Sequence, residues 1–384
     1  MLRLLKSLNK RDALEELAAV GLSRPSDQQI ALLVNEEALC FDSSFVEVKM
    51  IASDHQLPGT WLGDGSSGWI VAKAGRLDSW LHTLKTTLPT DSRLRTLVAA
   101  SLDALAQTAW RFETCNQVLD LTHTQIMGIL NITPDSFSDG GLFINSDQAY
   151  AQGMRMLEEG ADILDIGGES TRPGAEDISL EDEWKRIEPV IKRLSRETCL
   201  LSVDTYKSEI ARRALCEGVH IVNDISGLTF DNDMPKVLRE WNVPVILMHL
   251  QGTPRDMQRQ PHYDHLMAEL TSSLMARCNA AEAAGLTKII IDPGIGFGKR
   301  LEDNYEIIRR LDELRVLGKP ILLGTSRKSF IGNYLNVETA HRLPGTIASN
   351  LFGVLKGAAI LRVHDVWEAK QSLDIWQAIH ENKA

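Results

Sequence analysis

Short, mostly apolar runs alternate with amphipathic stretches of helical length from residue 126 to the end of the chain. Such runs are typical of strands that are buried on both faces of a sheet. They cover residues 126–130, 163–166, 200–203, 221–222, 245–248, 289–291, 321–323 and 360–363. Eight strand–helix units of this size predict a closed (β/α)8 barrel of the α/β class. A doubly wound open sheet stays the alternative, because periodicity does not show closure. Ser146, Ser179 and Asp303 are expected to cap helices.

The first 122 residues have a different pattern, which predicts a small α+β domain. Strand-like runs occur at 30–34, 46–51 and 69–71, and helical periodicity occurs over 11–19, 77–84 and 93–109. Histidines are sparse here and the acids are not clustered, so we expect no catalytic site in this part. The predicted domains are therefore 1–122, an extension of unknown role, and 123–384, the catalytic barrel.

Composition narrows the class of protein. The net charge of −11 argues against nucleic acid or an anionic membrane as the main partner. The five cysteines are scattered and form no Cys-x-x-Cys pair, which argues against a disulfide framework or a zinc ribbon. No apolar run reaches membrane-spanning length, and the first residues lack the apolar core of a signal peptide. A protein of the reducing cytoplasm is the expectation.

Each predicted barrel strand runs into a polar residue at or just beyond its C-terminal end. These residues are Asn131, Asp165, Asp204, Asn223, His249, Asp292, Ser326 and Arg362. A single residue of this kind is more often a helix cap or a turn residue. In a closed barrel, however, all eight converge on one mouth, where the catalytic groups of this architecture lie.

The polar residues fall into two chemical groups. Asp204, Asn223 and Asp292 are acceptor-rich groups on apolar strands, which favours a flat heterocyclic ligand with several N–H donors. The second group is cationic or hydroxylic and fits a phosphate or diphosphate. It comprises Thr171, Arg172, Arg327, Lys328, Arg362 and His364. Asn131 and the acidic loop after it would hold Mg²⁺ on that diphosphate.

The stretch 294–299 contains three glycines and a lysine but matches neither a phosphate-binding P-loop nor a dinucleotide fingerprint. The spacing of its glycines is wrong for both. We interpret it as a tight loop that lets Asp292 and Phe297 approach a flat ligand.

Taken in order, eight segments of the chain resemble the motifs of the dihydropteroate synthase family. These segments are 127–141, 165–174, 202–205, 223–225, 248–254, 292–299, 326–329 and 362–366. The resemblance runs from about Gln125 to the C-terminus. It implies a (β/α)8 barrel that condenses (7,8-dihydropterin-6-yl)methyl diphosphate with 4-aminobenzoate in folate biosynthesis. Diphosphate would leave first, and the amine would capture a pterin-methylene cation.

The resemblance also implies a role for individual residues. The implied pterin site comprises Asp204, Asn223, Met248, Asp292, Phe297, Lys328 and Arg362. The implied diphosphate site comprises Asn131, Thr171, Arg172, Arg362 and His364, with Asn131 as the Mg²⁺ ligand. The implied 4-aminobenzoate site comprises Phe137, Thr171, Pro173 and Ser326. Asp139, Lys328 and Arg362 are the implied catalytic residues. A homodimer and inhibition by sulfonamides are implied as well.

Two other functions compete with this interpretation. A methyltetrahydrofolate-dependent methyltransferase has a similar pterin pocket but binds no diphosphate, whereas this chain has Ser-Thr-Arg-Pro-Gly at 170–174. A non-catalytic pterin-binding paralogue would be expected to lack parts of the two loops that carry Phe137, Asp139 and Arg172, and all three residues are present.

Overall fold

The structure, a computed structural model, describes residues 2–5, 37–41, 60–62, 68–72, 85–86, 93–133, 142–170 and 178–380. Contacts divide the chain into two compact units. One unit contains Met1–Thr108, Tyr263–Ser272 and Arg310–Gly318, and the other contains Ala109–His262, Ser273–Arg309 and Lys319–Ala384. This division begins the second unit at Ala109, before the predicted boundary at residue 122. The separate role of the extension stays a prediction.

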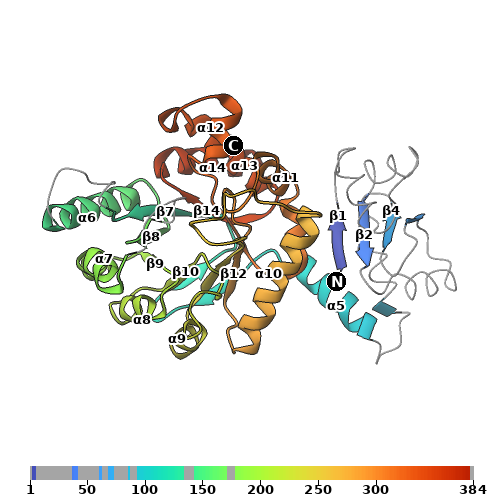
Figure 1. Cartoon of the computed structure of the whole chain (residues 1–384), viewed down its shortest axis with the longest axis horizontal. Helices are drawn as coiled ribbons and strands as arrows, with labels where there is room; N and C mark the ends of the chain where they lie inside the picture. The colour runs from blue at the N-terminus through green and yellow to red at the C-terminus, as the bar shows by residue number, and fades with distance from the viewer. Residues whose placement is uncertain are drawn as a thin grey trace. The chain divides into compact units, whose positions relative to one another are not determined.

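Eight strands of the second unit form a closed barrel in which every neighbouring pair is parallel (Figure 1). They are β7 (Gln125–Asn131), β8 (Ile163–Gly167), β9 (Leu200–Asp204), β10 (Ile221–Asp224), β11 (Val245–Met248), β12 (Ile289–Asp292), β13 (Ile321–Leu323) and β14 (Ala358–Val363). Pairing of β14 with β7 closes the ring. The predicted (β/α)8 barrel is therefore confirmed, and the open sheet is excluded.

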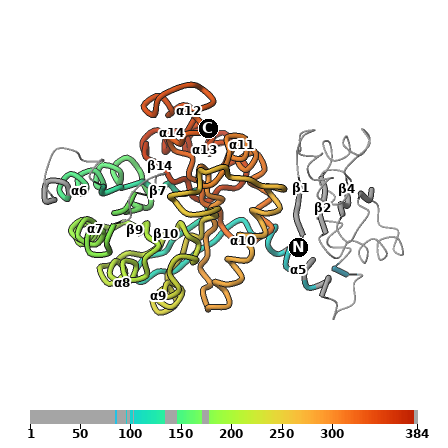
Figure 2. Tube along the Cα trace, in the orientation of Figure 1, coloured from blue at the N-terminus to red at the C-terminus, as the bar shows by residue number. Residues whose placement is uncertain are grey.

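Helices follow the strands around the outside of the barrel, as the chain trace shows (Figure 2). They are α6 (Leu142–Glu158), α7 (Leu180–Leu194), α8 (Ser208–Cys216), α9 (Met234–Trp241), α10 (Leu266–Ala283), α11 (Leu301–Arg309), α12 (Ser329–Leu335), α13 (Leu343–Leu355) and α14 (Val366–His380). The described residues also contain two 3-10 helices, η2 (Leu311–Leu317), which belongs to the first unit, and η3 (Thr339–His341). Within the described residues, no helix is both long and apolar enough to cross a membrane.

One of the three predicted helix caps is confirmed. The Ser179 hydroxyl accepts a hydrogen bond from the backbone N–H of Asp182 at 3.1 Å and caps α7. The other two predictions are wrong, because α6 and α11 begin earlier than expected. Ser146 therefore lies inside α6, and Asp303 lies in the first turn of α11. There the Asp303 carboxylate accepts the backbone N–H of Arg300 at 2.8 Å.

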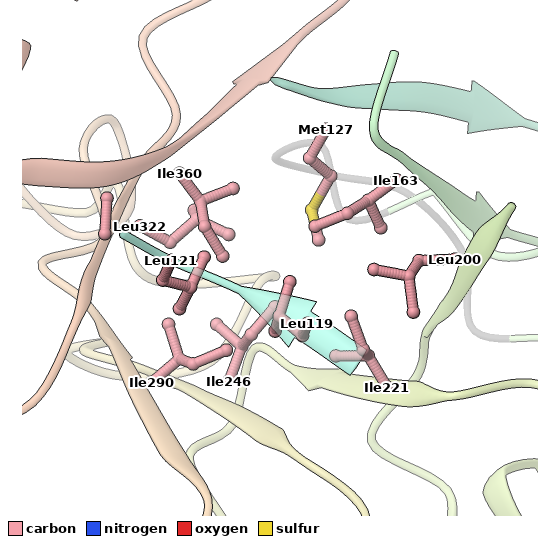
Figure 3. Packing of buried hydrophobic residues seen from close by; sticks show 11 residues of the cluster. Leu119, Leu121, Met127, Ile163, Leu200, Ile221, Ile246, Ile290, Leu322 and Ile360 are labelled. Atoms are coloured by element: carbon pink, nitrogen blue, oxygen red, sulfur yellow. The ribbon is translucent and has the colours of Figure 1, made fainter. Parts of the chain in front are cut away.

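A hairpin that the sequence did not predict covers the N-terminal end of the barrel. Its strands are β5 (Arg111–Glu113) and β6 (Val118–Asp120). Leu119 and Leu121 are 0% and 2% exposed and point into an apolar cluster (Figure 3). The rest of that cluster is Met127, Ile163, Leu200, Ile221, Ile246, Ile290, Leu322, Ala359 and Ile360. We call these eleven residues the barrel floor.

In the first unit, a four-stranded antiparallel sheet has the order β1-β2-β4-β3. The strands are β1 (Leu2–Leu5), β2 (Glu37–Phe41), β3 (Thr60–Leu62) and β4 (Gly68–Ala72), and a helix α5 (Arg93–Ala106) follows. The predicted strand at 69–71 and helix at 93–109 are confirmed by β4 and α5. The predicted elements at 11–19, 30–34, 46–51 and 77–84 lie outside the described residues.

Candidate active site

A charged hydrogen-bond network joins the four strands β14, β8, β9 and β10 inside the C-terminal end of the barrel, which we call the mouth. The Arg362 guanidinium donates from Nε to Asp165 Oδ2 at 2.6 Å and from one terminal nitrogen to Asp204 Oδ2 at 2.7 Å. Asn223 Nδ2 donates to the same Asp165 oxygen at 3.0 Å. Arg362 is therefore held by two carboxylates, and the network fixes how its remaining donors are aimed.

Several oxygen atoms at the mouth are buried without a hydrogen-bond partner among the described residues. They are Asp165 Oδ1, Asp204 Oδ1 and Ser202 Oγ. A buried carboxylate oxygen without a donor costs free energy. Such acceptors, lying at the catalytic end of a barrel, are what a ligand with several N–H donors would satisfy.

The ionisation of Asp204 reflects these surroundings. Burial raises the pKa of Asp204 to about 7, Arg362 opposes the rise, and the neighbouring Asp165 adds to it. Burial also raises the pKa of Asp292, where Lys328 is the main opposing charge. Because these carboxylates are destabilised in the free protein, donors from a ligand should be bound strongly by their ionised forms.

Asp292, Phe297 and Lys328 lie together on another side of the mouth. Asp292 Oδ1 accepts the backbone N–H of Gly294 at 2.7 Å. The Lys328 ammonium lies 4.7 Å from the centroid of the Phe297 ring and donates to the Ile295 carbonyl. Burial lowers the pKa of Lys328 to about 8, although Asp292 opposes this shift. Met248, 3% exposed, belongs to a small apolar cluster against which Phe297 packs.

The structure brings Ser326 and His364 into contact. The Ser326 hydroxyl lies 3.0 Å from His364 Nδ1 and accepts the backbone N–H of His364 at 3.1 Å. Between the predicted site residues Ser326 and Lys328, Arg327 has a left-handed backbone with a φ of 56° and pairs with Asp365 at 2.9 Å. This pair joins the loops after β13 and β14.

Asn131, the predicted metal ligand, ends β7 beside Gly167. A Cβ added at Gly167 would lie 3.3 Å from Asn131 Oδ1 and 3.8 Å from Asp204 Oδ2. A side chain at position 167 would therefore crowd the Asn131 oxygen, whereas its contact with Asp204 would be an ordinary one. In the described ranges, no group of three or more His, Cys, Asp or Glu residues is arranged to hold a metal ion. A single amide oxygen is compatible with Mg²⁺, which commonly takes few protein ligands and relies on phosphate oxygens and water.

Five predicted site residues lie outside the described residues. They are Phe137, Asp139, Thr171, Arg172 and Pro173. The structure does show how the second of their segments is flanked. Lys207 Nζ donates to Glu169 Oε2 at 3.0 Å and to the Ile178 carbonyl at 2.9 Å, which joins the residues on either side of 171–177.

Asp165 lies at a strand end in the sequence but is not one of the predicted site residues. It is completely buried and accepts hydrogen bonds from both Arg362 and Asn223. A charged residue within the apolar run 163–166 was the available signal, because only a partner or ligand makes such a position tolerable.

Comparison with known proteins agrees with this geometry. A profile of the family described as "Pterin binding enzyme" matches residues 127–364. Dihydropteroate synthase from Haemophilus influenzae is 44% identical over 266 residues, which cover 68% of this chain and 96% of that protein. The enzyme of the same name from Escherichia coli is 43% identical over 263 residues, with 68% and 93% covered. This chain belongs to the dihydropteroate synthase family.

Solved structures support the same assignment. Dihydropteroate synthase from Yersinia pestis, solved with a sulfonamide drug complex, has a TM-score of 0.68 and 41% identity and covers 71% of this chain and 100% of its own. The Xanthomonas albilineans enzyme in complex with 7,8-dihydropteroate has a TM-score of 0.65 and 40% identity, with 71% and 99% covered. As a member of the dihydropteroate synthase family, the chain is an enzyme, a transferase, and its barrel is the pterin-binding barrel of that family.

Proposed function

We propose that this chain condenses (7,8-dihydropterin-6-yl)methyl diphosphate with 4-aminobenzoate to give 7,8-dihydropteroate and diphosphate. One observation carries the proposal: the mouth of the barrel holds buried acceptor oxygens of Asp165, Ser202 and Asp204 that have no partner in the described part of the chain. A pterin edge supplies N–H groups to such acceptors. The relatives named above carry the same activity in their names.

The pterin would lie across the mouth with its N–H edge toward Asp204, Asn223 and Asp292. Lys328 and Met248 would complete this pocket, and Phe297 would contact the ring. Arg362, already aligned by two carboxylates, would stack on the ring and reach the diphosphate. Thr171, Arg172 and His364 would hold the rest of the diphosphate.

Departure of diphosphate leaves a delocalised pterin-methylene cation, and the amine nitrogen of 4-aminobenzoate then forms the new C–N bond and loses a proton. Such a reaction requires stabilisation of charge more than a protein nucleophile. The mouth has both signs of charge: Arg362 and Lys328 would stabilise the leaving anion, and Asp139 would face the cation.

Asn131 would bind Mg²⁺ together with diphosphate oxygens and water. Bound there, Mg²⁺ would supply positive charge that stabilises the departing diphosphate. Chelation with EDTA should abolish turnover, and added Mg²⁺ should restore it. Binding of 6-hydroxymethylpterin, which has no diphosphate, should be unaffected by EDTA. Full turnover in EDTA would contradict the metal assignment.

The direct test is to incubate the purified chain with the pterin diphosphate, Mg²⁺ and 4-aminobenzoate and to detect 7,8-dihydropteroate by mass spectrometry. We expect product to accumulate with equimolar release of diphosphate. Tight binding of the pterin without any product would instead indicate a non-catalytic pterin-binding protein.

Phe137, Thr171, Pro173 and Ser326 would line the 4-aminobenzoate site. Sulfonamides share the aniline with a polar group para to it, so they should occupy the same place. We expect competitive inhibition against 4-aminobenzoate, and binding that is far tighter when pterin, diphosphate and Mg²⁺ are present. Noncompetitive kinetics would contradict the shared pocket.

A homodimer is also proposed, and an exposed apolar surface on α13 and α14 supports it. These two helices pack against each other. On them, Leu355 and Ile375 are each 63% exposed and Trp367 is 51% exposed. Large apolar side chains that are exposed on adjacent helices favour an association surface. Sedimentation should show a dimer that Leu355→Glu converts to monomers. An unchanged dimer in that variant would place the interface elsewhere.

A further inference from the structure

Lys299, at the end of the glycine-rich stretch 294–299, is a buried lysine with no assigned role. Lys299 is only 3% exposed. Lysine is almost never buried to this extent without a carboxylate partner. None of the hydrogen bonds of Lys299 in the described residues goes to a carboxylate. The position therefore requires an explanation beyond an ordinary ion pair.

The three contacts of the ammonium join two different segments at the barrel mouth. Lys299 Nζ lies 2.9 Å from the Phe297 carbonyl oxygen, 3.1 Å from His249 Nδ1 and 3.4 Å from the His249 carbonyl oxygen. His249 directly follows β11 and the pocket residue Met248. Phe297 lies in the loop after β12, downstream of Asp292. Lys299 thus fastens the end of β11 to the loop that carries Phe297.

Backbone packing shows how closely these segments are held. Gly294 has a φ of 69°, and a Cβ there would lie 2.0 Å from the His249 carbonyl oxygen. Gly298 has a φ of 59°, and its Cβ would lie 2.7 Å from the Gln251 carbonyl oxygen. Glycine alone permits this approach. The hydrogen bonds of the Lys299 ammonium to His249 and Phe297 add attraction between these two closely packed segments.

We propose that Lys299 is a positioning residue for the pterin site, which holds Phe297 and the Met248–His249 end of β11 in the arrangement that receives the ring. The inference rests on the proposed function, because it assumes that the ligand of this pocket is a pterin. Lys299 itself need not touch the ligand.

Charge on Lys299 matters because three acceptors require three N–H donors. An ammonium has three, whereas a neutral amine has two. Burial lowers the pKa of Lys299 to about 7, and Asp292 opposes that shift. The other charged groups around it are Lys328, Asp303 and Arg277, and the pKa of the adjacent His249 is lowered well below normal by burial and by Lys299. Above about pH 7 the ammonium should lose its proton, and the hydrogen bonds that link β11 to the Phe297 loop should therefore weaken.

The test compares Lys299→Met, Lys299→Arg and the native chain. Calorimetry with 6-hydroxymethylpterin measures the pocket, and steady-state kinetics give KM for 4-aminobenzoate. We expect Lys299→Met to bind the pterin about tenfold more weakly, with KM for 4-aminobenzoate changed less than about twofold. Lys299→Arg, charged at every pH, should keep its affinity between about pH 7 and about pH 9 better than the native chain does.

A stability control separates positioning from general damage. Leu215→Ala, in α8, removes buried apolar contacts from a residue that is 1% exposed. It should lower the unfolding midpoint without changing pterin affinity. If Lys299→Met does not fold, Lys299→Gln takes its place, with the same expected loss.

A folded Lys299→Met or Lys299→Gln chain with native pterin affinity would overturn the positioning role while leaving the proposed function intact. Equal pH profiles for the native chain and Lys299→Arg would overturn the role of the ammonium. Failure of the native chain itself to bind 6-hydroxymethylpterin would instead refute the proposed function.

Discussion

The floor and the mouth of the barrel are lined by the same strands and have opposite chemistry. Side chains two residues apart on a strand point to the same face. On six strands such a step leads from the floor to the mouth. The pairs are Ile163 and Asp165, Leu200 and Ser202, Ile221 and Asn223, Ile246 and Met248, Ile290 and Asp292, and Ile360 and Arg362. In five of these six pairs, the residue at the floor is apolar and the residue at the mouth is charged or carries a hydrogen-bonding group.

This difference separates stability from binding. The floor buries apolar side chains beneath the β5–β6 hairpin, and burial of this kind is the main stabilising contribution in a fold. The mouth holds carboxylate oxygens that are unpaired in the described residues and are costly until a ligand arrives. Binding sites commonly carry such a cost in the free protein. The comparison predicts that mutations at the two ends change different quantities.

The largest effect is expected at the floor, for Leu119→Ala. Leu119 is completely buried, so its truncation should lower the free energy of unfolding by about 2–5 kcal/mol. Urea unfolding measures this loss. Affinity for 6-hydroxymethylpterin should stay native in the folded fraction. A folded variant with much weaker pterin binding would show that the two ends are coupled.

Asp204→Asn at the mouth should do the opposite of Leu119→Ala: it should weaken pterin binding and leave stability nearly native. The amide replaces one acceptor oxygen with a donor, so a charged hydrogen bond worth roughly 1.5–3 kcal/mol is lost. Pterin affinity should fall about tenfold to a hundredfold, with little change in the unfolding midpoint. Calorimetry and urea unfolding on the same sample check both parts.

Asp224→Asn is a matched control for that variant. Asp224 is also buried, but its oxygens accept the backbone N–H groups of Ser226 at 2.8 Å and Leu228 at 2.9 Å. Its substitution should lower the free energy of unfolding and leave pterin affinity nearly unchanged. Equal losses of affinity in the two variants would mean that burial of an aspartate, and not its place at the mouth, is what matters.

Up to about pH 7, a rise in pH should strengthen pterin binding through Asp204 and remove the contribution of that residue to stability. The pKa of Asp204 is raised to about 7 in the folded chain by burial. Its contribution to the stability of the free protein is therefore present at low pH and is lost as pH rises through about 7. Ionised Asp204 is the better pterin acceptor, so affinity should fall by up to about tenfold per pH unit below about pH 7. Asp204→Asn should flatten this acidic limb, and a native acidic limb in that variant would assign the titration to another group.

The smallest effect is expected from deletion of residues 1–92. This deletion retains α5, whose Leu105 carbonyl accepts a hydrogen bond from Arg315 of η2 at 2.8 Å. If the extension takes no part in catalysis, turnover should stay within a few-fold of the native rate. A folded, soluble fragment without activity would show that the extension contributes to the site or to an essential dimer.

Much of the barrel could be predicted from the sequence, because strands buried on both faces leave apolar runs that periodicity detects. The runs 245–248 and 321–323 coincide with β11 and β13. The floor hairpin was missed because β5 and β6 have three residues each, too few to show any period. What reveals them is tertiary packing of Leu119 and Leu121 on residues far along the chain.

The acceptors of the site were also predictable, since Asp204, Asn223 and Asp292 are polar groups placed where apolar strands end. Their partners were not. The bond from Arg362 to Asp165 joins residues 197 positions apart, and no local pattern specifies that pairing. For the same reason the sequence marked Lys299 as part of a motif but did not reveal that its ammonium binds His249 and Phe297.

The most direct test of pterin binding at the mouth is one calorimetric series with 6-hydroxymethylpterin on the native chain, Leu119→Ala and Asp204→Asn, with urea unfolding of each sample. We expect native affinity and reduced stability for Leu119→Ala, and affinity reduced at least about tenfold with near-native stability for Asp204→Asn. Native affinity in Asp204→Asn would contradict the claim that the mouth of the barrel binds the pterin.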